Sequence, residues 1–168
     1  MQTLEQGLHE EALAQADRVL QIACARSLTI ATAESCTGGL LAALLTDVPG
    51  RSHVFERGFV VYSEIAKCEM LAIDPALIAQ HGAVSREVAE EMALGALKRS
   101  QAEVALAVTG FAGPGAEEDE EGLVHLACAR RGVAKDHREE HFGPIGRAGV
   151  RHGTISVALE MLEESLSK

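Results

Sequence analysis

Two short segments of the chain hold side chains that could act together on a carbonyl group. The first is ESCTGG at 34–39, where a predicted strand gives way to a predicted helix. A serine at such a turn can expose its Oγ, while the backbone N–H groups that follow, helped by the positive end of the helix, face an oxyanion. The alternative interpretation of Ser35 is a plain helix N-cap, with the glycines serving close packing.

The second segment is YSEIAK at 62–67, which holds the only tyrosine of the chain. Tyr62 stands at the end of a predicted strand, and Lys67 lies on the predicted helix that follows. A lysine that burial and nearby positive charge keep neutral can accept the proton of a serine hydroxyl, so Lys67 is a candidate base for Ser35. The alternative is a solvated lysine beside a half-buried tyrosine, because lysine side chains are mostly exposed. Cys36 is a second candidate nucleophile, although the lack of a nearby histidine favours a small buried residue.

A third segment, TGFAGPG at 109–115, follows the apolar run VALAVT at 104–109, which is typical of a strand buried on both faces. Ligands of open α/β sheets bind beyond the carboxyl ends of the strands, so this loop should lie beside Ser35. Its glycines, including Gly110 and Gly113, could present N–H groups to a phosphate or a carbonyl. The segment matches neither the dinucleotide-binding fingerprint nor the P-loop, so by itself it indicates little.

Charged and metal-ligating side chains offer fewer candidates. Arg147, near the start of the last predicted helix, could clamp an anion because a guanidinium binds phosphate in a bidentate manner. Arg151 is interpreted as a surface arginine. His137 and His141 lie four residues apart but lack the HExxH order and fall on a predicted strand. We therefore expect neither a metal site nor a cofactor.

The composition excludes several classes of partner. The chain has 168 residues and a formal net charge of −10, and no Lys/Arg-rich run offers nucleic-acid phosphates a basic patch. No apolar run approaches the ~20 residues of a membrane span, and the acidic N-terminal segment is unlike a signal peptide. The four cysteines form no CxxC pair, which indicates reduced thiols in the cytoplasm. We expect neither nucleic-acid nor membrane partners.

The spacing of apolar residues predicts the elements that must position these side chains. Helices are expected over about 4–25, 40–46, 64–71, after Pro75, over 86–98 and from Gly146 onward. Strands are expected over 27–33, 53–62, 104–109, 122–129 and 137–142. This alternation predicts a three-layer α/β/α sandwich, and a hairpin of the last two strands would make its sheet mixed. No linker divides the chain, so residues 1–168 are expected to form one domain.

Four segments together resemble the C-terminal domain of the CinA family of competence/damage-inducible proteins: AESCTGG at 33–39, FERGFVVYS at 55–63 with Lys67, QHGAVS at 80–85 and VTGFAGPG at 108–115. Stand-alone members of this family include nicotinamide mononucleotide deamidases. The resemblance implies a mixed sheet of roughly five strands. It also implies hydrolysis of the carboxamide of nicotinamide mononucleotide, giving nicotinic acid mononucleotide and ammonia for pyridine-nucleotide recycling, without a cofactor.

The resemblance also implies roles for individual residues. Ser35 would be the nucleophile, Lys67 its base and Tyr62 a helper in the proton network. Thr109 would contribute to the site, and Arg147 would bind or orient the substrate. The further substrate-contacting residues expected around the carbonyl and the phosphate are Cys36, Thr37, Gly38, Gly110 and Gly113.

A rival hypothesis is a non-catalytic ligand-binding or protein-interaction module that acts in competence or the damage response. It is favoured by Gly146, which stands where the family has an Asp before Arg147. The joint presence of Ser35, Tyr62 and Lys67 favours the enzyme, because a pure binder does not need a serine–lysine pair. A deamidase for another small amide would differ only in its substrate. Family habit favours a homodimer, although the sequence does not set the number of subunits.

Overall fold

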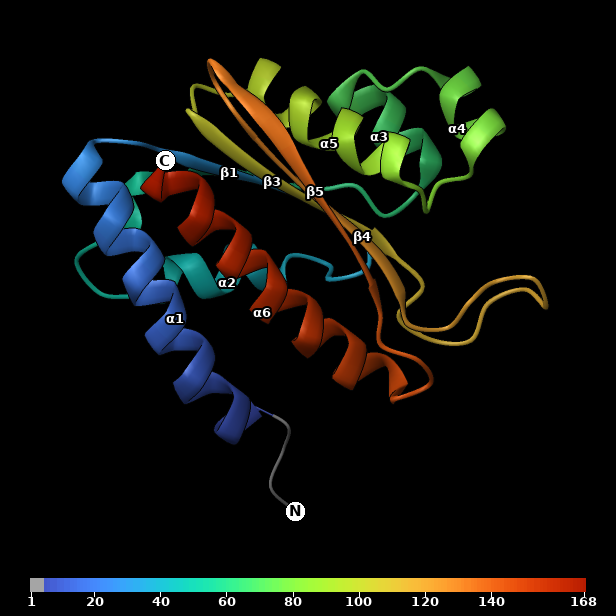
Figure 1. The fold of residues 1–168 in the computed structure, drawn as a ribbon, viewed down its shortest axis with the longest axis horizontal. Helices are drawn as coiled ribbons and strands as arrows, with labels where there is room; N and C mark the ends of the chain where they lie inside the picture. Colours follow the sequence, from blue (N-terminus) through green and yellow to red (C-terminus); the bar gives the residue numbers. More distant parts are fainter. Residues whose placement is uncertain (1–4) are drawn as a thin grey trace.

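The computed structural model describes residues 5–168 (Figure 1). Its helices are α1 (Glu5–Arg26), α2 (Leu40–Thr46), α3 (Glu64–Leu71), α4 (Pro75–His81), α5 (Arg86–Lys98) and α6 (Gly146–Ser167), with a 3-10 turn at Ser52–Val54. Its strands are β1 (Ile30–Glu34), β2 (Phe55–Val60), β3 (Val104–Gly110), β4 (Leu123–Arg130) and β5 (Val133–His141). The order of helices and strands follows the prediction throughout.

The strands described in residues 5–168 form one five-stranded sheet in the order β2-β1-β3-β4-β5. β1 runs parallel to both of its neighbours, β2 and β3. β4 and β5 are antiparallel, as a hairpin requires. The sheet is therefore mixed, and the expected fold class is confirmed. The parallel part matters for the site, because the carboxyl ends of β1, β2 and β3 all lie at one edge.

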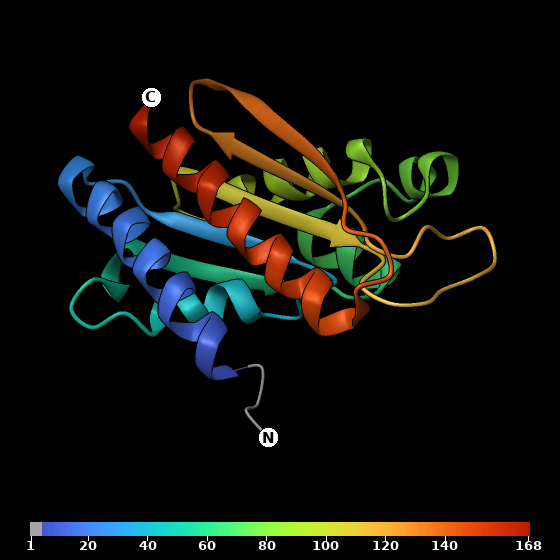
Figure 2. The ribbon, with the colours of Figure 1, turned by 60° about the horizontal axis from the view of Figure 1, so that its bottom comes forward.

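Helices cover both faces of the sheet, as two views of the ribbon show (Figures 1 and 2). The long helices α1 and α6 lie side by side with the short α2 on one face. The helices α3, α4 and α5 cover the other face, with α5 in direct contact with β3 and β4. No helix within the described part of the chain is long and apolar enough to cross a membrane.

Side-chain size alternates along the central strands, and this sets how closely each helical layer approaches. The buried residues that face α1 and α6 are larger: Ile30, Val104, Leu106, Val108, Val124 and Leu126. Those on the opposite face, towards α5, are almost all alanine: Ala31, Ala33, Ala105, Ala107, Ala127 and Ala129. Because alanine occupies little space above the sheet, α5 can pack close to β3 and β4.

Three strand boundaries differ from the prediction. β1 begins at Ile30 rather than at Ser27, because α1 continues to Arg26 and Ser27 then adopts a left-handed conformation with φ of 52°. β2 begins only at Phe55, after the 3-10 turn, and ends at Val60. β5 extends from Val133 to His141, well before the expected start. It is an edge strand with few buried positions, so its sequence lacks the apolar alternation that identifies a strand.

Gly95 of α5 packs directly against the end of α3, the helix that carries Lys67. A Cβ added at Gly95 would collide with the carbonyl oxygen of Leu71 and lie 2.9 Å from Leu71 Cβ. Because this backbone cannot move away as a side-chain end can, we expect Gly95→Ala to lower the free energy of unfolding by about 1–3 kcal/mol in urea denaturation. Gly149→Ala in α6 is the matched control, since its Cβ would meet only the side chain of Ile145. The control should lose no stability, and equal midpoints for the two variants would contradict the prediction.

Candidate active site

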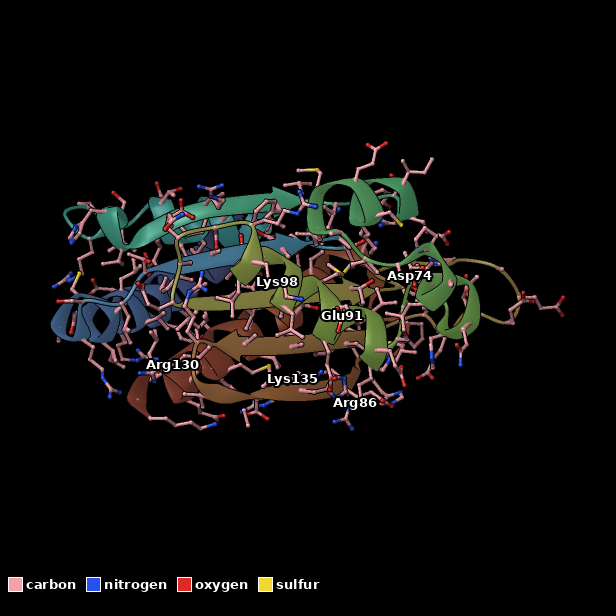
Figure 3. The ribbon with its side chains drawn as sticks, turned by 90° about the horizontal axis from the view of Figure 1, so that it is seen from above. Asp74, Arg86, Glu91, Lys98, Arg130 and Lys135 are labelled. Carbon is pink, nitrogen blue, oxygen red and sulfur yellow. The ribbon has the colours of Figure 1, made fainter. Side chains whose placement is uncertain are left out.

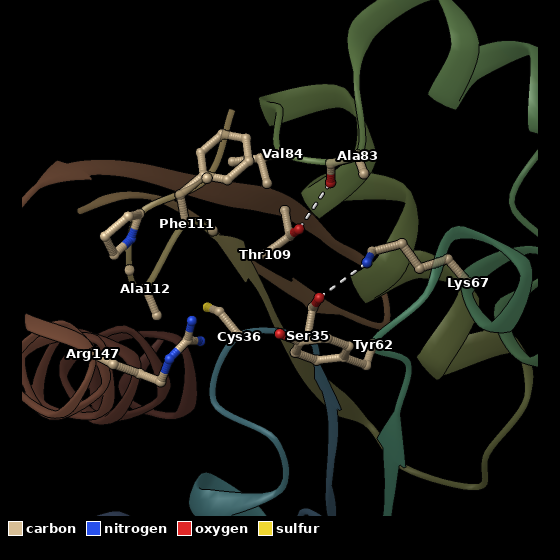
Figure 4. A pocket seen from close by; sticks show the side chains of 14 residues that line it. Ser35, Cys36, Tyr62, Lys67, Ala83, Val84, Thr109, Phe111, Ala112 and Arg147 are labelled. Atoms are coloured by element: carbon tan, nitrogen blue, oxygen red, sulfur yellow. Dashed lines mark hydrogen bonds between the residues drawn. The ribbon is translucent and has the colours of Figure 1, made fainter. Parts of the chain in front are cut away.

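A pocket of about 240 Å³ opens at the carboxyl ends of β1, β2 and β3 (Figure 4). Each of these strands leads directly into one wall of the pocket: β1 into Ser35, β2 into Tyr62, and β3 into the glycine-rich loop. Of the residues singled out in the sequence, those that line it are Ser35, Cys36, Tyr62, Lys67, Thr109, Gly110, Gly113 and Arg147. Thr37 and Gly38 are not part of its wall.

Ser35 and Lys67 meet inside this pocket. Lys67 Nζ lies 3.0 Å from Ser35 Oγ, across 32 positions of sequence, and Figure 4 shows the two side chains pointing at each other. Lys67 Nζ also lies 3.2 Å from the carbonyl oxygen of Val61, to which it donates. The lysine side chain is only 1% exposed and the serine 7%. The alternative interpretation of Lys67 as a solvated lysine is therefore wrong.

Local structure explains why the two groups meet. The backbone N–H of Ser35 donates to the carbonyl of Val108 at 3.0 Å, which fixes the serine at the edge of the sheet. Ser63 Oγ accepts from the N–H of Ala66 at 3.1 Å and so starts α3 immediately after β2. Lys67 lies one turn into this helix, on the face that turns towards the sheet. The hydroxyl of Ser35 thus lies within hydrogen-bond reach of an amine that could accept its proton.

Burial determines the protonation of both candidate groups beside Ser35. Desolvation lowers the pKa of Lys67 below its usual value of 10.5, because the buried ammonium loses its hydration. The expected positive neighbour of Lys67 does not contribute, since the nearby groups Cys36, Glu64 and Cys68 act in the opposite direction. Burial likewise raises the pKa of the Cys36 thiol to about 11. Cys36 is therefore a protonated thiol at neutral pH, poorly suited to act as a nucleophile.

Ser35 does not cap a helix. The side chain that caps α2 is that of Glu34. α2 begins only at Leu40, and its N-cap position, Gly39, has no side-chain bond. Instead the buried Glu34 carboxylate accepts the N–H groups of Gly39, Leu41 and Ala42. The expectation that the positive end of this helix faces the pocket is wrong, because a carboxylate already occupies it. Sequence analysis missed this function of Glu34, since an acidic residue at the end of a strand gives no sign of reaching a later helix.

Two backbone N–H groups of the turn remain available. Gly38 N–H donates to the carbonyl of Ser35 at 3.1 Å. Among residues 5–168 the N–H of Thr37 has no acceptor, and the N–H of Cys36 meets only the thiol of its own residue. These two groups follow Ser35 directly, where an oxyanion hole for an attack by Ser35 would lie.

Tyr62 and Thr109 line the pocket in different ways. The Tyr62 side chain is 64% exposed, and within the described residues no hydrogen bond joins its phenol to Ser35 or Lys67. Thr109 Oγ1 donates to the carbonyl of Ala83 at 2.8 Å. That bond ties β3 to the segment before α5, which explains why Ala83 and Val84 form part of the pocket wall.

The two arginines of α6 contact different segments: Arg147 the glycine-rich loop and Arg151 the turn after Ser35. Arg147 is exposed and packs on the glycine-rich loop, since a Cβ added at Gly113 would lie 3.0 Å from Arg147 Nη2. Among the described residues it makes no ion pair. Arg151 is half-buried, and its Nε donates to the carbonyl of Cys36 at 2.7 Å. The interpretation of Arg151 as a surface arginine is therefore wrong.

The two histidines considered as metal ligands, His137 and His141, both lie on β5 and do not line the pocket. His137 Nε2 lies 3.1 Å from Nδ1 of His125, and the two rings stack. His141 contacts the carboxylates of Glu120 and Glu139. Within residues 5–168 no group of three or more His, Cys, Asp or Glu side chains is placed to hold a metal ion.

The chain is thus an α/β/α protein in which a buried lysine contacts a serine in a pocket at the carboxyl ends of parallel strands. It belongs to the CinA C-terminal domain family, whose model matches residues 12–166.

Several relatives are closely similar to the chain. It is 46% identical over 149 residues to the nicotinamide-nucleotide amidohydrolase PncC of Escherichia coli strain K12, which covers 87% of this chain and 89% of that protein. It is also 46% identical over 140 residues to a CinA-like protein of Mycobacterium marinum, but this match covers only 33% of that longer protein. Among solved structures, the competence/damage inducible protein CihA of Agrobacterium tumefaciens has a TM-score of 0.89 and 45% identity, over 94% of this chain and 96% of that one.

Proposed function

We propose that this protein hydrolyses the carboxamide of nicotinamide mononucleotide to nicotinic acid mononucleotide and ammonia, as part of pyridine-nucleotide recycling. The contact of 3.0 Å between Ser35 Oγ and the buried Lys67 Nζ carries this proposal, because it supplies a nucleophile and a base in one pocket. The substrate is taken from the name of the Escherichia coli relative, whose length matches that of this chain.

The reaction proceeds in two halves. Ser35 Oγ attacks the carboxamide carbon while neutral Lys67 takes the hydroxyl proton, and the N–H groups of Cys36 and Thr37 bind the oxyanion. The C–N bond then breaks, and Lys67 returns the proton to the nitrogen, which leaves as ammonia. Water attacks the acyl-enzyme with Lys67 again as base. The C–Oγ bond breaks, Lys67 returns the proton to Ser35 Oγ, and the carboxylic acid product loses its proton to solvent and leaves as the carboxylate.

The remaining pocket residues hold the nucleotide. Arg147 and the loop with Gly110 and Gly113 bind the phosphate or the ribose, since no acidic side chain in the described part of the chain pairs with the Arg147 guanidinium. Tyr62 lines the pocket and, once substrate excludes water, assists proton transfer to the leaving nitrogen. A cytoplasmic location fits the four free thiols, which include the half-buried Cys24 and Cys68.

Incubation of the purified chain with nicotinamide mononucleotide tests the proposal directly. We expect equal amounts of ammonia and nicotinic acid mononucleotide, measured by a coupled ammonia assay and by chromatography of the nucleotides. Nicotinamide riboside is the matched control substrate, because it keeps the carboxamide and lacks the phosphate that Arg147 would bind. We expect it to react with a much higher KM. Absence of ammonia from both compounds would contradict the proposal.

The second candidate function is a binding module without turnover. Its specific support is Gly146, with φ of 81°, which precedes Arg147 where an acid would have held the guanidinium. This candidate predicts that nicotinamide mononucleotide binds, as measured by calorimetry, and is recovered unchanged.

A further inference from the structure

We propose that Glu34 is a positioning residue of this site, whose buried carboxylate holds the turn 35–39 in the shape that the reaction needs. The inference rests on the proposed function, in which Ser35 Oγ and the N–H groups of Cys36 and Thr37 act on a carbonyl carbon. Part of the kcat of that reaction then depends on Glu34, a side chain that does not line the pocket.

The Glu34 carboxylate is fully buried and surrounded by hydrogen-bond donors. Its Oε2 accepts from Thr37 Oγ1 at 2.7 Å, from Leu41 N at 3.0 Å and from Gly39 N at 3.1 Å. Its Oε1 accepts from Ala42 N at 2.8 Å and from Thr32 Oγ1 at 3.3 Å. No lysine or arginine within the described residues pairs with it. The backbone N–H groups at the start of α2 therefore stabilise this buried charge and offset its loss of hydration.

These hydrogen bonds connect the two ends of the turn 35–39, which contains Ser35. The backbone of Glu34 is part of the sheet, because its carbonyl accepts from Val61 N at 2.8 Å. Its carboxylate accepts hydrogen bonds from the first residues of α2, which follow the turn. Both ends of the turn are thus fixed to one residue, directly before Ser35. The two glycines that complete the turn have φ of +62° and +96°, so they allow a path that would strain other residues.

The turn also fixes the direction of the two available N–H groups. In a trans peptide the C=O and N–H point in opposite directions, and the described residues include no cis peptide. The carbonyl of Ser35 is held by Gly38 N–H at 3.1 Å, which orients the N–H of Cys36. The carbonyl of Cys36 is held by Arg151 Nε at 2.7 Å, which orients the N–H of Thr37. Glu34 completes this arrangement, because it holds the side chain of Thr37 and the N–H of Gly39.

The alternative is that Glu34 only caps α2. A cap is most often a short polar side chain at the position directly before the helix. Here that position is Gly39, and the carboxylate comes from the end of the preceding strand instead. A serine at position 39 would cap one N–H of α2 but could not reach back to β1, whereas the Glu34 carboxylate joins the two elements that flank Ser35.

The test is Glu34→Gln, which keeps the shape and removes the charge. A glutamine amide has one acceptor oxygen, so its NH₂ group must face either the donors at Oε2 or the N–H of Ala42. We expect kcat for nicotinamide mononucleotide to fall about 10–100-fold with KM changed less than about twofold, because an oxyanion hole displaced by a fraction of an ångström loses transition-state binding first. Thr37→Ser should retain more of kcat than Thr37→Val, since serine keeps the hydroxyl that donates to Glu34.

Glu103→Gln is the matched control. Glu103 also accepts from a threonine, through Thr29 N at 2.7 Å and Thr29 Oγ1 at 2.6 Å, but it lies at the other end of β1 and β3. We expect wild-type kcat and KM for this variant. Unchanged kcat in Glu34→Gln, an effect on KM alone, or the same loss in Glu103→Gln would overturn the inference.

Labelling of Ser35 by diisopropyl fluorophosphate, followed by intact mass, separates this inference from the proposed function. If the wild type releases no ammonia but is labelled at Ser35, the proposed substrate fails, and the labelling rate decides about Glu34. Slower labelling of Glu34→Gln then supports the positioning role, and an equal rate refutes it. If the wild type neither releases ammonia nor is labelled, Ser35 is no nucleophile and both proposals fall.

Discussion

Replacing Ser35 by alanine is expected to reduce ammonia release from nicotinamide mononucleotide by at least about 10³-fold, because no acyl-enzyme can form without its Oγ. The residual rate would come from substrate binding and the oxyanion-binding N–H groups, which Ser35→Ala leaves in place. The measurement is kcat from initial rates of ammonia release, with enough enzyme to detect a turnover lower by four orders of magnitude.

The fold of Ser35→Ala should remain intact, since the one hydrogen bond of Ser35 Oγ within residues 5–168 is with Lys67 Nζ. Ser100→Ala is the matched control: Ser100 is also a buried serine, 6% exposed, and its Oγ accepts from Ala102 N at 3.3 Å, far from the pocket. We expect wild-type turnover from this control. If Ser35→Ala keeps a tenth of the wild-type kcat, another group attacks the amide, and Cys36→Ser on that background identifies whether the neighbouring thiol is that group.

The sequence was sufficient for the fold and for most of the expected pocket residues, although Thr37 and Gly38 lie outside the wall. Apolar spacing located the helices and the central strands, because their two-sided burial leaves a strong pattern in residues such as those of β3. The expected helix starts at 64 and 86 agree with the structure, where the side chains of Ser63 and Ser85 cap α3 and α5. The same chemistry suggested a third cap at Ser35. That suggestion failed because the cap depends on where the chain turns after Ser35, which local residue types do not determine.

Contacts between distant positions could not be predicted from spacing. Arg151 reaches Cys36 across 115 positions, and nothing in the residues around 151 distinguishes it from an exposed arginine of an amphipathic helix. The burial of Lys67 depends likewise on how α3 packs against α5, through contacts such as that of Leu71 with Gly95. Motif resemblance singled out Lys67, but only the packing makes it a lysine with a lowered pKa.

The second large effect is expected for Lys67→Met, which keeps most of the volume and removes the base. Turnover should fall about 10²–10⁴-fold, the range that general base catalysis contributes. Lys67→Arg should be equally inactive, because a guanidinium stays protonated at any accessible pH.

In the wild type, kcat/KM should rise about tenfold per pH unit on the acid limb and level off above the pKa of Lys67, since only the neutral amine accepts the proton. Burial places that plateau below pH 10.5.

The pH dependence of stability provides a separate test of the same lysine. Because burial lowers the pKa of Lys67 in the folded state, the unfolded chain binds more protons between that pKa and 10.5. As the pH rises through this window, the free energy of unfolding of the wild type should therefore increase relative to that of Lys67→Met. Below the window the difference between the two proteins should be constant. Urea denaturation across this pH range measures the gain. If Lys67 kept its charge in the folded protein, the unfolding free energies of the two proteins would run parallel over this pH range, and the prediction would be wrong. If the predicted change in their difference is seen and Lys67→Met is inactive, the variant has lost its base and kept its fold.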